Sequence, residues 1–119
     1  MEIKTFKDLI VWQKSYALVL EVYKATNKFP TEEKFGLTSQ MRRSSVSIAS
    51  NIAEGYARRN TKENAYFINI AYGSATELET QIIITKDIRL INKNEFTITD
   101  GLLESTLKLL YNYRKYLKS

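Results

Sequence analysis

Polar side chains, carboxylates among them, recur along one side of the segment 37–58. They stand three and four residues apart, the spacing that brings side chains to one face of a helix. The row consists of Gln40, Ser44, Ser47, Asn51, Glu54 and Arg58. Across an antiparallel seam, its end would face Ser74 and Glu77 of the following segment. Two carboxylates placed in this way could act as acid and base or hold a metal.

The composition argues against catalysis and favours a structural role for this polar row. The 119 residues include no His and no Cys, which excludes a Ser-His or Cys-His pair, a thiolate or imidazole zinc site and a disulfide framework. We therefore expect no catalytic residue, no metal and no cofactor, and predict that the protein is not an enzyme. Because buried polar groups need partners, we expect an internal hydrogen-bond network instead. Its expected members are Ser47, Asn51, Glu54, Ser74 and Glu77.

Basic residues are unevenly distributed along the chain. The net charge is +5, with 18 Lys and Arg against 13 Asp and Glu, and no Lys or Arg occurs between positions 64 and 85. A basic balance favours a polyanionic partner. Near the end of the sequence stands a second basic group, Lys108, Arg114, Lys115 and Lys118. The expected nucleic-acid contacts are Arg42, Arg43, Arg58, Arg59 and Lys62.

These five expected contacts also have a structural interpretation. Arginine suits phosphate because its planar fork donates two hydrogen bonds to one group. The same side chains can instead form ion pairs with neighbouring glutamates. Positions 42 and 58 of one helix differ by roughly 160° in projection, so the two arginine pairs do not share a helix face. Only an assembly would align them.

Four long helices are expected to position these side chains. The chain has only four Gly and one Pro, and its apolar residues recur at three- and four-residue steps. Asn60 is the expected N-cap of the third helix, with Glu63 in capping-box register. Short connections make neighbouring helices antiparallel. The predicted helices span 6–27, 37–58, 61–90 and 98–118.

The predicted fold is all-α: an antiparallel up-and-down four-helix bundle that fills residues 1–119 as a single domain. The expected core face of the first helix is Leu9, Gln13, Tyr16, Leu20 and Tyr23, and that of the second includes Leu37, Met41, Ile48, Ile52 and Gly55. For the third helix it is Tyr66, Phe67, Ile70, Ala71, Ser74, Leu78 and Ile82, and for the fourth Leu102, Leu103, Thr106, Leu109, Leu110, Tyr113 and Leu117. No window approaches the roughly 20 apolar residues of a spanning helix. We expect no membrane partner and a cytoplasmic location.

Aromatic residues and one glycine bear on contacts between helices. On the core stripes, buried tyrosines are expected at Tyr16, Tyr23, Tyr66 and Tyr113. Off these stripes, tyrosines that stack on bases or line a subunit interface, the interface being favoured, are Tyr56, Tyr72, Tyr111 and Tyr116. Gly73 stands inside a helical pattern, where glycine costs about 1 kcal/mol relative to alanine. Close approach of another helix is the simplest reason for it.

Four separated motifs together resemble one bacterial family. They are Leu9-Ile10-Val11-Trp12-Gln13, Phe29-Pro30-x-Glu32-Glu33-x-Phe35-Gly36-Leu37, Ser47-Ile48-x-x-Asn51-Ile52-Ala53-Glu54-Gly55-Tyr56 and Ile70-Ala71-x-Gly73-Ser74-x-x-Glu77-Leu78-Glu79-Thr80. In this order they resemble the four-helix-bundle family first noted in 23S ribosomal RNA intervening sequences. The resemblance covers about residues 6 to 90.

The resemblance implies a non-enzymatic protomer that assembles into a ring-like homo-oligomer, a pentamer. The sequence is also similar to the accessory protein of diversity-generating retroelements, a related bundle that binds nucleic acid through a basic surface and associates with a reverse transcriptase. The expected function is therefore an oligomeric bundle protein that binds RNA or DNA with little sequence specificity. The alternative is a homo-oligomeric scaffold that binds another protein and no nucleic acid.

Overall fold

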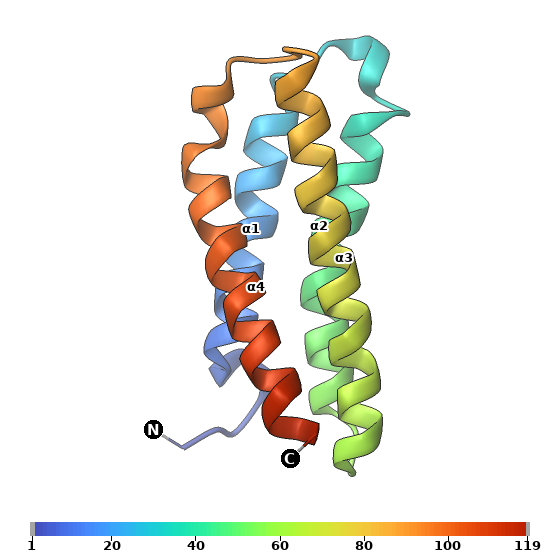
Figure 1. The fold of residues 1–119 in the computed structure, drawn as a ribbon, viewed down its shortest axis with the longest axis vertical. Helices are drawn as coiled ribbons and strands as arrows, with labels where there is room; N and C mark the ends of the chain where they lie inside the picture. The colour runs from blue at the N-terminus through green and yellow to red at the C-terminus, as the bar shows by residue number, and fades with distance from the viewer. Residues whose placement is uncertain (1, 119) are drawn as a thin grey trace.

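Four antiparallel helices run side by side along the long axis of the molecule (Figure 1). The computed structural model describes residues 2–118, which contain no strand. The helices are α1 (Ile10–Thr26), α2 (Leu37–Tyr56), α3 (Thr61–Asp87) and α4 (Thr97–Lys118), and short 3-10 turns precede α1, α2 and α4 at Phe6–Asp8, Thr31–Glu33 and Lys93–Phe96. Each helix packs on the next in sequence, and α1 packs on α4. The predicted all-α up-and-down bundle is confirmed, with α1 and α3 on diagonally opposite corners.

The helix boundaries differ from the prediction by up to four residues, and the two largest differences have local reasons. Helix α1 begins at Ile10 because Leu9 is extended, with φ −72° and ψ 126°, after the turn Phe6–Asp8. Helix α3 ends at Asp87 because Arg89 adopts the left-handed conformation, with φ 55°. The Leu90 N–H then donates to the Thr85 carbonyl at 3.2 Å, the hydrogen bond with which a left-handed residue typically closes a helix.

The core face of α1 is a correction to the sequence analysis. Leu9 of the predicted stripe packs against the core, but Tyr16, Leu20 and Tyr23 keep 49%, 48% and 40% of their surface exposed. Instead, Leu18 and Val22 are fully buried. Leu20 lies roughly 160° around the helix from Leu18, so α1 carries apolar residues on two nearly opposite faces. The smaller aliphatic side chains fill the narrow core, whereas the tyrosines keep their hydroxyl groups on the surface.

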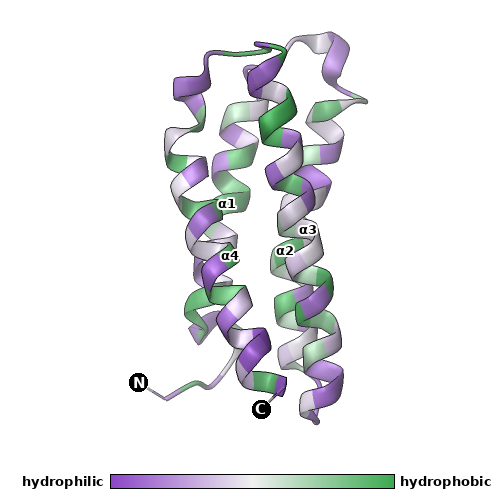
Figure 2. Cartoon of the chain, in the orientation of Figure 1, coloured by the Kyte–Doolittle hydropathy of each residue, from purple (hydrophilic) through white to green (hydrophobic). Residues whose placement is uncertain are grey.

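The other helices follow the expected pattern more closely. In α2, Met41, Ile48 and Ile52 are fully buried as predicted. In α3, the expected burial of Ala71, Leu78 and Ile82 is confirmed, but Tyr66 and Ile70 are 62% and 37% exposed. In α4 the buried residues are Thr99, Leu103, Thr106 and Leu110. Figure 2 shows hydrophobic and hydrophilic residues alternating along every helix, as expected when one face of each helix is buried.

Gly55 allows α2 and α3 to approach closely just before the turn that joins them. A Cβ at this position would lie 2.7 Å from the Asn64 Oδ1 and 3.1 Å from both the Asn64 carbonyl oxygen and the Phe67 Cβ. By contrast, a Cβ at Gly73 or Gly101 would meet nothing within 4 Å. The close approach expected at Gly73 therefore has no partner inside the protomer, whereas the seam does require a glycine at position 55.

Substitution of these glycines tests the packing of this seam. We expect Gly55→Ala to lower the free energy of unfolding by about 1 to 2 kcal/mol, because overpacking outweighs the better helix propensity of alanine. The matched control, Gly101→Ala, should raise it by about 0.5 to 1 kcal/mol. Urea unfolding at equal protein concentration measures both. Equal stabilisation by the two substitutions would contradict the close approach at Gly55.

Candidate nucleic-acid interface

A short polar chain crosses the seam between α2 and α3. The Ser47 and Ser74 hydroxyl groups lie 2.8 Å apart, and the Asn51 side-chain amide donates to the Ser47 carbonyl at 2.8 Å and to its hydroxyl at 3.1 Å. All three residues are half-buried. The Asn51 hydrogen bonds stay within α2, whereas the Ser47–Ser74 contact joins the two helices and forms at one register of α2 against α3. This contact therefore fixes how the two helices align.

Two of the five residues expected in this network lie outside it. Glu54 is exposed and binds Arg58, one helical turn further on, at 2.6 Å. Glu77 is also exposed, at the mouth of a surface groove that includes Arg43. Neither carboxylate takes part in the hydrogen bonds of Ser47, Asn51 and Ser74. The described residues contain no group of three or more potential metal ligands.

The antiparallel arrangement brings two basic groups together at one end of the bundle. The end of α2, the start of α3 and the end of α4 meet there, beside the segment that precedes α1 (Figure 1). Lys62 and Lys118, which are 56 positions apart in the sequence, line one groove. We call this surface the basic end and define it by Arg58, Arg59, Lys62, Arg114, Lys115 and Lys118.

The local geometry of the α2–α3 turn orients two of these side chains. Asn60 caps α3 as predicted: its side-chain oxygen Oδ1 accepts the Glu63 N–H at 2.8 Å. The returning contact runs from the Asn60 side-chain amide to the Glu63 carboxylate, at 2.6 Å. This capping holds the turn in one conformation. Arg59 and Lys62, on either side of Asn60, consequently project from a fixed backbone.

Carboxylates at the basic end form ion pairs or hydrogen bonds with neighbouring groups. Glu54 binds Arg58, and Glu63 binds the Asn60 amide. Asp8 accepts the backbone N–H groups of Thr5 at 3.0 Å and Lys4 at 2.8 Å, and these hydrogen bonds lower its pKa. Over the described part of the chain, Arg59, Lys62 and Lys115 form no ion pair. The six cations that define the basic end outnumber Glu54, Glu63 and Asp8 beside them, so this end carries a surplus of positive charge.

Aromatic rings hold two arginines of the basic end in place. The Arg58 guanidinium lies 4.7 Å from the centre of the Phe67 ring, and that of Arg114 lies 4.3 Å from the centre of Tyr72. Such contacts restrict a guanidinium without neutralising its charge. Arg114 comes from the second basic group, which the sequence analysis left out of the expected contacts. The predicted up-and-down topology could have identified it, because α2 and α4 run in the same direction and therefore end at the same end of the bundle.

Arg42 packs against the protein rather than facing solvent. Its Nε donates to the Thr26 hydroxyl and its Nη2 to the Asn27 side-chain oxygen, each at 2.9 Å, and its guanidinium lies 4.4 Å from the centre of the Tyr23 ring. Two of the N–H donors of Arg42 are therefore occupied within the protein. This side chain joins the end of α1 to the start of α2.

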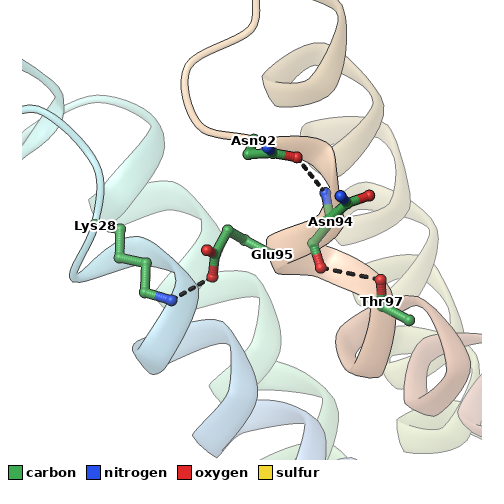
Figure 3. Close-up of polar contacts among 5 residues, drawn as sticks. All are labelled: Lys28, Asn92, Asn94, Glu95 and Thr97. Atoms are coloured by element: carbon green, nitrogen blue, oxygen red, sulfur yellow. Dashed lines mark hydrogen bonds and ion pairs between the residues drawn. The ribbon is translucent and has the colours of Figure 1, made fainter.

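At the end that contains Arg42 and exposed Arg43, two ion pairs join different elements of the chain. Lys28, just after α1, forms an ion pair with Glu95 of the 3-10 turn Lys93–Phe96 (Figure 3). On either side of this turn, the Asn92 side chain accepts the Asn94 N–H and the Thr97 hydroxyl donates to the Asn94 carbonyl. Lys86 and Asp100 also form a pair, at 2.6 Å. The five expected contacts thus divide between opposite ends of a bundle whose long axis measures 43 Å.

Fold and charge distribution define a small antiparallel four-helix-bundle protein with basic residues from three helix ends gathered at one end. Residues 7–112 match the family model of the 23S rRNA-intervening sequence protein. The chain belongs to this family, which confirms the family resemblance seen in the sequence.

One solved structure has the same fold over nearly its whole length. It is a protein of unknown function from the S23 ribosomal protein family of Bacteroides thetaiotaomicron VPI-5482. The TM-score is 0.82 at 24% identity, covering 92% of this chain and 98% of that chain. No curated protein matches the sequence at a significant level. None of the described helices is long and apolar enough to cross a membrane.

Replacing Arg42 and Arg43 one at a time distinguishes the contribution of packing to stability from that of surface charge. We expect Arg42→Ala to lower the free energy of unfolding by about 1 to 2 kcal/mol, because two hydrogen bonds and a cation–π contact are lost. The exposed neighbour, Arg43→Ala, should change it by less than about 0.5 kcal/mol. Thermal and urea unfolding measure both. Equal effects would show that Arg42 does not join α1 to α2.

Proposed function

We propose that this protein is a non-enzymatic, oligomeric bundle protein that binds RNA or DNA through phosphate contacts at its basic end. The observation that carries this proposal is the convergence of two basic groups on one end, where the nearby carboxylates already have partners. Phosphate contacts supply affinity but carry no sequence information directly. We therefore expect little sequence specificity.

The proposed contacts differ from those expected from the sequence. Arg59, Lys62 and Lys115 carry charge that no ion pair offsets in the described structure. Arg58 is paired with Glu54 on the surface, and such exposed pairs are weak enough for phosphate to replace the carboxylate. Arg42 is absent from the set because its donors are used inside the protein. Arg43 lies at the opposite end of the bundle.

Two exposed apolar faces support self-association. On α1 the face consists of Tyr16, Leu20 and Tyr23, and on α3 it consists of Ile70, Ile84 and Ile88. Each points away from the core: Ile84, for example, lies roughly 160° around α3 from buried Ile82. Gly73 leaves open space on the same side of α3, and no Lys or Arg occurs from 64 to 85. We propose that the α1 face of one copy covers the α3 face of the next.

This contact would generate a ring. Because α1 and α3 occupy diagonally opposite corners, the two faces point in opposite directions, and their contact is head-to-tail rather than self-complementary. Head-to-tail contacts produce a ring when the rotation closes; the family resemblance suggests five copies. Lateral contacts in a ring would place every basic end on the same rim. A long polyanion could then contact several copies at once, which raises its overall affinity.

Nucleic-acid binding is tested by fluorescence anisotropy with single- and double-stranded RNA and DNA from about 50 to 300 mM salt. We expect affinity to fall steeply with salt. The combined substitution of Arg59, Lys62, Lys115 and Lys118 by Ala should weaken binding by about tenfold or more and flatten the salt dependence.

The matched control removes the same charge from the opposite end, by changing Lys34, Arg43, Arg89 and Lys93 to Ala. It should change affinity by less than about threefold if the basic end is the contact surface. Equal losses in the two variants would show that net charge, not the basic end, determines binding. No binding at 50 mM salt would favour the scaffold that binds another protein.

Self-association is tested by a charge placed on the α1 face. We expect Leu20→Glu to convert the oligomer to monomers, because the carboxylate would be buried between copies without a partner. Ile10→Glu is the matched control: Ile10 is 62% exposed but lies off the α1 face, so its oligomer should persist. Size-exclusion chromatography with light scattering measures the mass. A monomeric wild type would overturn the proposed assembly.

A further inference from the structure

An open groove lies at the basic end, between the start of α3 and the end of α4. Lys62, Tyr66 and Asn69 line it from α3, and Leu117 and Lys118 line it from α4. Its volume is about 450 Å³, the size of a site for a small planar group rather than for a helix. Ala65 also lines it, so the groove combines an apolar surface with two lysines.

The groove is chemically suited to an unpaired nucleotide. Among residues 2–118, which the structure describes, no carboxylate side chain lines the groove, so none of these side chains repels a phosphate. Lys62 and Lys118 supply positive charge from two helices. Tyr66 supplies an aromatic ring, and Asn69 supplies an amide that can both donate and accept hydrogen bonds. Aromatic side chains beside basic residues form the stacking platforms on which single strands bind.

Tyr66 has no core function that would explain an aromatic ring at this position. It is 62% exposed, and its ring contact is with Phe67, the next residue in sequence, at 5.2 Å in an edge-to-face arrangement. On the helix surface, Tyr66 lies one turn from Lys62 and three residues from Asn69. These three side chains therefore share one face of α3, with the ring between a cation and an amide.

We propose that this groove binds single-stranded nucleic acid, with one base stacked on Tyr66 and the flanking phosphates bound by Lys62 and Lys118. The inference rests on the nucleic-acid binding proposed above and specifies its ligand. A duplex keeps its base faces stacked on one another, so it can reach the lysines but not the ring. Because every base has a flat face, stacking of this kind is compatible with low sequence specificity.

The experiment compares three probes of equal length on the full chain at about 100 mM salt: a polythymidine strand, the same strand with abasic sites in place of bases, and a DNA duplex. We expect Tyr66→Leu to weaken polythymidine binding by about 5- to 100-fold, with no change for the abasic strand or the duplex. Tyr66→Phe should bind like the wild type, because it keeps the ring.

A matched control changes an exposed aromatic residue beside a lysine at the opposite end. Phe35 is 88% exposed and lies with Lys34 5.5 Å from its ring centre, so Phe35→Leu should leave binding to all three probes unchanged. Circular dichroism and light scattering establish that each variant keeps its fold and its oligomer mass.

Three results would overturn the inference. If Tyr66→Leu binds polythymidine as the wild type does, while the basic-end variant loses it, stacking is wrong and phosphate binding stands. Loss of the oligomer in Tyr66→Leu would assign the ring to a subunit interface. If the wild type binds none of the probes even at 50 mM salt, the proposed function and this inference both fail.

Discussion

The close packing of α2 against α3 is the constraint on which the rest of the structure depends. Gly55 has no Cβ, which would collide with Asn64 and Phe67. The Ser47–Ser74 contact sets the register further along the seam. Together they determine where the α2–α3 turn lies. Since that turn carries Arg59 and Lys62, the packing of the core also positions part of the candidate interface.

Charge is separated along the bundle because chain direction alternates. At the end that contains Arg42, cations meet carboxylates on other elements, as in Lys28–Glu95 and Lys86–Asp100. The first pair joins the segment just after α1 to the 3-10 turn before α4, and the second joins α3 to α4. At the basic end the carboxylates bond instead to the backbone or to residues nearby in sequence. The same fold thus joins separate elements by ion pairs at one end and gathers basic residues from two parts of the sequence at the other.

The sequence predicted the helices well because glycine, proline and capping residues act locally, as Asn60 and Glu63 illustrate. It failed where a helix has two apolar faces. In α1, periodicity alone could not distinguish Leu18, which is buried, from Leu20, which is not. The candidate site was only partly predictable, because Lys62 and Lys118 become neighbours through topology. Likewise, only the tertiary structure shows that Arg42 already has partners on α1.

The central claim is that nucleic acid contacts one end of the bundle and not the other. Mapping by hydrogen–deuterium exchange, with and without a saturating single-stranded oligonucleotide, tests it most directly because it reports on every segment at once. The account predicts slower exchange across residues 57–66 and 111–118 and unchanged exchange across 28–43 and 88–97. Protection centred on 28–43, or none anywhere in an oligonucleotide complex shown to have formed, would contradict it.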